Sequence, residues 1–260
     1  MPGLTVARIA LGCGNFGGVR PRLTTKTFNP MQAGADHGLQ PDRIARQLRA
    51  SLDRLGVDQV DLYLAHDYDP AVPLAESLGA FRAAQADGLI GAYGVSNFDE
   101  RQLAAALAAG APTAIQNSYS LLARQDEPEL LPLCAERGLA YLAFGPLAGG
   151  WLTGIYRRDV PYPAGSRMTQ RPEPYREFVS RQTFDTLDEL QVIAARRGTS
   201  LAGLALGWLL ADERVTQVVI GPDRPEHLAP VAEALRHPVT GDDRTKIQAA
   251  VARSHREDVP

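Results

Sequence analysis

The chain has 260 residues, 45% of them hydrophobic and 22% charged, which is enough for one large α/β barrel with a packed core. Its formal net charge of −3 argues against a nucleic-acid or anionic-membrane partner, because such proteins carry a basic excess. The two cysteines, Cys13 and Cys134, stand in no Cys-x-x-Cys or metal-ligand spacing, so we expect no metal site. Residues 1–6 lack a signal-peptide pattern, and no apolar run is of membrane-spanning length. We therefore expect a cytoplasmic protein.

Short apolar runs alternate with helix-period segments from the start of the chain. The runs at 9–11 and 23–28 are predicted strands, and the second is rich in β-branched residues. In the segment 41–55, apolar residues recur at the i, i+4, i+8 and i+11 spacing of one helix face. The next predicted elements are a strand at 60–65, a helix at 74–87, a strand at 90–95, a helix at 99–109 and a strand at 114–116.

The second half continues the alternation. Asp99 and Gly110 are predicted to cap the helix between them. Residues 145–176 are rich in Gly, Pro, Arg and Tyr, and loops of this length are usually functional. The remaining predicted elements are a helix at 128–137, a strand at 139–144, helices at 179–197 and 201–211, a strand at 215–220, a helix at 225–235 and one more after Asp242.

Repeated strand–helix alternation predicts βαβ units around a parallel sheet, in one domain spanning residues 1–260. The strands are continuous apolar runs, as in sheets that are covered on both faces. A closed barrel and a doubly wound sheet both remain open at this level. The glycine-rich run GCGNFGG at 12–18 misses the dinucleotide-binding spacing, which weakens the doubly wound alternative.

Active-site residues of a (β/α) barrel sit at the carboxyl ends of its strands. Several predicted strands end in polar side chains that can donate hydrogen bonds to an anionic oxygen. These residues are Lys26, His66 with Asp67, Ser96 with Asn97, and Gln116 with Asn117, while Gly145 and Gly221 end two further strands.

Four ordered motifs resemble the aldo/keto reductase family: GAYGVSNF at 91–98, AIQNSYSLL at 114–122, GPLAGGWLTG at 145–154 and VVIGPDRPEHL at 218–228. The segment 9–18 is similar to the family's first barrel strand. The resemblance implies a parallel TIM-type barrel and an NADP cofactor, with NAD as the alternative. It also implies a small carbonyl or alcohol substrate, and a loop at 145–176 that lies over the cofactor and substrate mouth.

The resemblance further implies a role for each matching residue. Lys26 would lower the pKa of a tyrosine acid, and His66 would orient the carbonyl oxygen. Ser96, Asn97 and Gln116 would hold the nicotinamide carboxamide, although Ser96 and Asn97 are also good helix caps. The other implied cofactor contacts are Phe144 at the nicotinamide ring, where it could equally be plain core, Gly145, Leu147 and Gly149 at the pyrophosphate, and Gly221, Arg224 and His227 at the adenosine phosphate.

The chain departs from the family pattern before Lys26. The family has an acid tyrosine and an aspartate after its second strand, but no Asp or Tyr precedes Lys26 in this sequence. Only residues 19–22 separate Gly18 from the strand at 23–28, whereas a crossover between parallel strands takes a dozen residues or more. We therefore expect a barrel that is missing or distorted around its second strand. The expected defect is a gap, a displaced N-terminal segment, or an edge covered by another copy of the chain.

Three hypotheses on function remain open. The leading one is an NADP(H)-dependent oxidoreductase, impaired by loss of the catalytic Tyr and Asp, with Tyr68, Tyr162 or Tyr175 as a substitute acid. The second is a lyase or isomerase that uses Lys26 and His66, and the third is a cofactor-binding pseudoenzyme. Asp223 stands where the family often has arginine, and an acid there would repel a 2′-phosphate.

Overall fold

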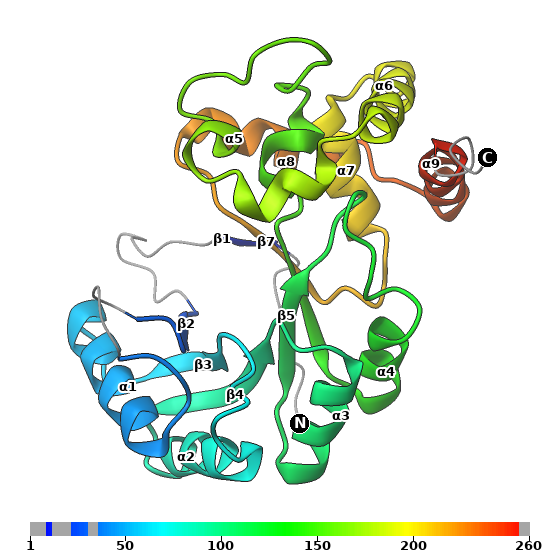
Figure 1. The fold of residues 1–260 in the computed structure, drawn as a ribbon. Coiled ribbons are helices and arrows are strands. Elements are labelled where there is room, and N and C mark those ends of the chain that lie inside the picture. Colours follow the sequence, from blue (N-terminus) through cyan, green and yellow to red (C-terminus); the bar gives the residue numbers. More distant parts are fainter. Residues whose placement is uncertain (1–8, 12–21, 31–35, 255–260) are drawn as a thin grey trace. The chain divides into compact units, whose positions relative to one another are not determined.

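The computed structural model describes residues 9–11, 22–30 and 36–254 (Figure 1). The chain divides into two compact units, which we describe separately. The first unit comprises residues 13–117 and 126–142, and the second comprises 1–12, 118–125 and 143–260. None of the helices in the described part of the chain is both long and apolar enough to cross a membrane.

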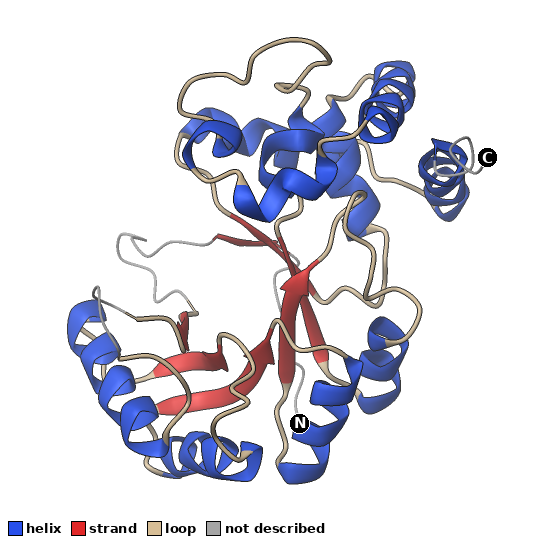
Figure 2. Cartoon of the chain, viewed as in Figure 1, coloured by secondary structure: helices blue, strands red, loops and turns tan. Residues whose placement is uncertain are grey.

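The first unit alternates strands with helices, and the helices α1 and α2 lie along one face of its sheet (Figure 2). The strand order is β6-β5-β4-β3-β2, and the pairs from β2 to β5 are parallel. The elements are β2 (Thr24–Thr27), α1 (Pro41–Leu55), β3 (Val60–Ala65), α2 (Leu74–Ala86), β4 (Ile90–Ser96), α3 (Glu100–Ala109), β5 (Ala114–Ser118), α4 (Leu130–Arg137) and β6 (Ala140–Phe144), with the ends of β5 and β6 crossing into the second unit.

Most boundaries of this unit follow from local sequence signals. Helix α1 begins with Pro41 in its first turn and ends at Gly56, whose φ of +64° is the left-handed conformation that glycine tolerates. Helix α3 begins at a capping box in which Asp99 accepts from the Gln102 N–H. The alternative reading of Ser96 and Asn97 as this helix's cap is therefore wrong. Gly110 ends the helix in an extended conformation and not in the expected left-handed one.

Strands β4 and β5 approach each other closely at Gly94. A Cβ atom added there would lie 2.3 Å from the Ala114 carbonyl oxygen and 2.8 Å from Leu64 Cδ2. Behind this contact, the ring of Phe81 packs on Tyr63 and Tyr93 at centroid distances of 5.2 and 5.9 Å. Only glycine fits at residue 94, and the fit sets the spacing of two strands that end in site residues.

Strand β2 is an edge strand in the part of the chain that the structure describes. It pairs with β3 from Thr24↔Leu62 to Thr27↔Ala65 and has no strand on its other side there. Among the described residues this edge of β2 is open, in line with a barrel that is distorted around the segment 23–28. Residues 12–21, where a displaced segment was expected, lie outside the described residues.

The second unit contains the parallel pair β1 (Ile9–Leu11) and β7 (Gln217–Ile220), with Ile9 opposite Val218. The segment 145–176, expected to be a loop, contains three short helices. Within this segment, the Trp151 ring packs against the ring of Tyr156 and also against that of Phe184 on α6. The helices of this unit are η1 (Ala148–Thr153), α5 (Arg167–Gln170), η2 (Glu173–Phe178), α6 (Arg181–Arg196), α7 (Leu201–Leu210), η3 (Pro225–Leu228), α8 (Ala229–Arg236) and α9 (Gly241–Ser254).

Replacing Gly94 by alanine should lower the free energy of unfolding by about 2 kcal/mol, because the new methyl group overlaps backbone atoms of β5. The matched control is Gly79→Ala in α2, where the nearest atom lies 3.8 Å from the added Cβ. That change should raise stability by about 0.5–1 kcal/mol, since alanine is the better helix former. Urea unfolding of both variants measures the two effects. Equal stabilities would contradict the close approach at Gly94.

Candidate functional site

Lys26 reaches from β2 across β3 to the end of β4. Its Nζ donates to Ser96 Oγ at 3.2 Å, and the Ser96 side chain is fully buried. Lys26 itself is half-buried, and burial lowers its pKa from 10.5 to about 8. A lysine in this setting exchanges its proton close to neutral pH, so it can act either as an ammonium or as an amine.

His66 follows β3 and is held by its backbone and by its ring. Its N–H donates to the Thr27 carbonyl at 2.9 Å, and its Nδ1 lies 3.1 Å from Asn29 Nδ2. Burial is the largest cause of its lowered pKa, followed by the positive charge of Lys26, and Asp67 opposes both. The ring is therefore neutral at pH 7. With Nδ1 accepting from the Asn29 amide, the ring proton is on Nε2.

Asn97 joins the ends of three strands. Its φ of +60° is left-handed, which costs free energy for any residue other than glycine. In this conformation its N–H reaches the Gln116 carbonyl at 3.2 Å and Asn117 Oδ1 at 2.8 Å. Its side-chain Nδ2 donates to the His66 carbonyl at 2.8 Å and approaches Ser96 Oγ at 3.4 Å. Since Ser96 stands opposite Gln116 in the strand register, all of these residues meet at one edge of the sheet.

A buried polar network holds the Asn117 side chain, which accepts a hydrogen bond from the Asn97 N–H. Asn117 Nδ2 donates to the Phe98 carbonyl and to Asp126 Oδ2, both at 2.9 Å. The hydroxyl of Tyr141 donates to the same Asp126 oxygen at 2.7 Å. Burial raises the pKa of Asp126, although these hydrogen bonds oppose the shift. Sequence reasoning noted Asn117 only as the residue after Gln116 and missed Asp126 and Tyr141.

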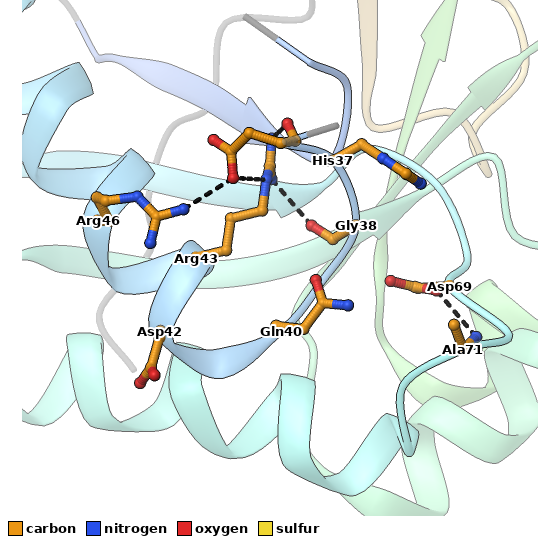
Figure 3. Close-up of a pocket in the computed structure, with 9 residues that line it drawn as sticks. His37, Gly38, Gln40, Asp42, Arg43, Arg46, Asp69 and Ala71 are labelled. Carbon is orange, nitrogen blue, oxygen red and sulfur yellow. Dashed lines mark hydrogen bonds and ion pairs between the residues drawn. The ribbon is translucent and has the colours of Figure 1, made fainter. Parts of the chain in front are cut away.

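The buried guanidinium of Arg43 on α1 holds the segment that follows Lys26 (Figure 3). Its Nη1 donates to Thr27 Oγ1 and to the Gly38 carbonyl, and its Nη2 donates to the Asn29 and Asp36 carbonyls, each at 2.9 Å. Its Nε lies 3.3 Å from Asp36 Oδ1. Sequence reasoning also missed this anchor, because an arginine in an amphipathic helix resembles any other surface charge.

The residues expected at the pyrophosphate form a left-handed turn in the second unit. Gly145, Ala148 and Gly149 have φ values of +64°, +48° and +63°. Leu147 is the N-cap of the helix η1, and its carbonyl accepts from the Gly150 N–H at 2.9 Å. A Cβ added at Gly149 would lie 2.5 Å from the Tyr175 ring. Phe144 ends β6 half-buried, with its carbonyl accepting from the Tyr119 N–H at 3.1 Å.

The residues expected at the adenosine end lie on an exposed turn after β7. Gly221, Arg224 and His227 are all exposed, and Arg224 directly precedes η3. His227 Nδ1 lies 2.6 Å from Asp223 Oδ1. The acid that would repel a 2′-phosphate thus contacts one of the residues expected to bind it.

Two of the three candidate acids, Tyr68 and Tyr162, make ring contacts. Tyr68 meets Phe98 edge-on at 5.5 Å in the first unit, which also contains Lys26. In the second unit, Tyr162 packs against Trp151 and Tyr156 at 6.3 and 5.4 Å. A role for any of them as an acid stays a prediction.

Comparison with known proteins supports the expected family. The model of the aldo/keto reductase family matches residues 14–252. The chain is 32% identical over 210 residues to the NADH-specific methylglyoxal reductase of Escherichia coli, covering 80% of this chain and 64% of that protein. It is 34% identical over 200 residues to the L-glyceraldehyde 3-phosphate reductase of the same organism, covering 73% and 57%.

The solved structure of a glycerol dehydrogenase from Gluconobacter oxydans matches with a TM-score of 0.75 at 27% identity, covering 86% of this chain and 68% of that one. The expected parallel α/β fold of the barrel class is thereby confirmed. The chain spans 57–64% of the length of the two reductases above.

The lowered pKa of Lys26 should make stability depend on pH. The unfolded lysine keeps its proton up to about pH 10.5 and the folded one only up to about pH 8, so the unfolded state binds more protons between these values. Stability should therefore rise with pH across this window. Urea unfolding of the native chain and of Lys26→Met measures the effect as a difference, which removes the contribution of other groups. A difference that is flat from pH 8 to 10.5 would show that Lys26 has an ordinary pKa.

Proposed function

The chain belongs to the aldo/keto reductase family, and on this premise we propose that it is a nicotinamide-dependent oxidoreductase acting on a small carbonyl or alcohol. The observation that carries the proposal is the gathering of Lys26, His66 and Ser96 at the ends of β2, β3 and β4 within one unit. When bound, the nicotinamide supplies or accepts the hydride. The named curated relatives that reduce aldehydes support this class of reaction.

The polar groups of the first unit suit a nicotinamide carboxamide. Ser96 offers a buried hydroxyl, and Gln116, only 5% exposed, offers an amide opposite it in the strand register. A hydroxyl and an amide can donate to and accept from a carboxamide. We assign Ser96 and Gln116 to binding of the carboxamide. Asn97 would contribute mainly by holding the strand ends together. Phe144, Gly145, Leu147 and Gly149 would line the ring and pyrophosphate, and Gly221, Arg224 and His227 the adenosine end.

In carbonyl reduction, two residues act on the substrate oxygen. His66 donates from Nε2 and orients the carbonyl, because its Nδ1 accepts from Asn29. The Lys26 ammonium stabilises the negative charge that develops on the oxygen and gives it a proton, which its pKa of about 8 permits. Since the family's tyrosine does not precede Lys26, we expect a rate below that of full-length relatives by about 10²–10⁴-fold, the usual contribution of a general acid.

Three further proposals complete this picture. The chain works as one functional domain of residues 1–260. The open edge of β2 pairs with a second copy of the chain, because an unpaired strand edge is a template for association. The protein is cytoplasmic and acts without a nucleic-acid or membrane partner, consistent with its net charge of −3.

Titration with NADPH and NADH, followed by fluorescence, should show binding, and added aldehydes should then be reduced. Lys26→Met should lower kcat by about 10²–10³-fold with little change in cofactor affinity, because it removes charge stabilisation at the reacting oxygen. Binding without turnover would indicate a pseudoenzyme. No binding by a folded chain would contradict the proposed function and favour a lyase or isomerase.

The pair between Asp223 and His227 should set the choice of cofactor, and we propose NADP use weakened by this acid. Asp223→Asn should tighten NADPH binding by about 2–5-fold and leave NADH unchanged, the size expected for an exposed charge. The matched control is Glu226→Gln, an exposed acid on η3. An equal effect of both variants, or a gain for NADH, would count against a specific role for Asp223.

A further inference from the structure

The chain contains only two lysines among its 27 basic residues, Lys26 and Lys246. Arginine supplies the positive charge at every other basic position. Arginine stays charged at all accessible pH values, whereas lysine can lose its proton and become a nucleophilic amine. A positive charge alone at residue 26 would not require a lysine in so arginine-rich a chain. A lysine at this position, unlike an arginine, can give up its proton and then act as an amine.

The surroundings of Lys26 hold its amine in place beside groups that transfer protons. Nζ lies 3.2 Å from the buried Ser96 hydroxyl, which fixes the direction of the side chain. His66 is near enough that the Lys26 charge lowers its pKa, and its ring nitrogen Nδ1 is engaged by Asn29. The His66 backbone carbonyl and Ser96 Oγ are further linked through Asn97 Nδ2. A held amine beside a neutral imidazole has the parts for carbonyl condensation.

We propose that Lys26 condenses with a small aldehyde or ketone to form an imine, a reaction separate from hydride transfer. Nζ attacks the carbonyl carbon, the C–N bond forms, and the electron pair of the C=O bond moves to oxygen. One proton passes from nitrogen to oxygen and gives a carbinolamine, while the His66 Nε2–H donates a hydrogen bond to that oxygen. The hydroxyl then takes a proton from solvent and leaves as water while the nitrogen lone pair forms the C=N bond, and the iminium nitrogen returns a proton to solvent. The balance is amine plus carbonyl to imine plus water, and no oxidant, reductant or metal is needed.

The same residue would thus serve two reactions according to its protonation state. As an ammonium it stabilises the negative charge on the substrate oxygen during hydride transfer. As an amine it attacks the carbonyl carbon. About half of the Lys26 side chains are neutral at pH 8. Imine formation needs no nicotinamide, so it can be tested when the proposed oxidoreductase activity fails.

The test uses the full chain at pH 8 without cofactor, with propanal as the probe and borohydride to trap the imine. Peptide mapping by mass spectrometry then compares Lys26 with Lys246, an exposed lysine of the same chain that acts as internal control. Lys26 should be labelled about ten-fold or more faster, because at pH 8 a lysine of ordinary pKa is almost wholly protonated. In the urea-denatured chain the two rates should become equal.

Two variants separate the held amine from general reactivity. Lys26→Arg should abolish the fast label and Lys246→Arg should leave it unchanged. His66→Gln should slow labelling of Lys26 several-fold without altering that of Lys246. The proposal is overturned if Lys246 in the native chain is labelled as fast as Lys26. An unchanged rate in His66→Gln would overturn the role given to His66. The native peptide map decides the main question even if a variant does not fold.

Discussion

The candidate site depends on the anchoring of an edge strand. Strand β2 has four residues and, in the described part of the chain, only β3 beside it, so the sheet holds Lys26 from one side. The other restraint comes from the buried guanidinium of Arg43, which binds the side chain of Thr27 and the carbonyl of Asn29 just beyond Lys26. Asn29 in turn holds the His66 ring. A single buried cation thus helps to position both Lys26 and His66.

The electrostatics of the site follow from this arrangement. Burial of Lys26 and His66 in one place disfavours the charged form of each, and the Lys26 charge lowers the His66 pKa further. At neutral pH the pair has a lower free energy with one positive charge than with two, so the imidazole is neutral and the lysine is mostly protonated. In the proposed reaction the neutral ring would therefore orient the substrate, while the lysine would supply the charge.

The residues at the strand ends of this site could be predicted from the sequence, but the buried residues that hold them in place could not. Strand ends were readable, because apolar runs such as 60–65 stop at polar residues, and parallel strands end at the same edge. Ser96 and Asn97 allowed a second interpretation, because both residue types favour helix caps. The capping box that Asp99 forms with Gln102 shows that Asp99 caps α3. Arg43 and Asp126 gave no signal, since their partners lie 5 to 16 residues away in the sequence and meet them only through the fold.

No tyrosine precedes Lys26 in the sequence, and the role proposed for this lysine therefore differs from the one that the family resemblance implies. Where a phenol stands between lysine and substrate, the lysine acts through the phenol and needs only its charge. In the proposed reactions no phenol is assigned to this place, and the protonation state of Nζ would decide between the two outcomes. A pKa of about 8 is a compromise between them, because a higher value would leave no amine and a much lower one no acid. In the proposed imine reaction, burial beside Ser96 would supply the lowered pKa that Lys26 needs to act as an amine.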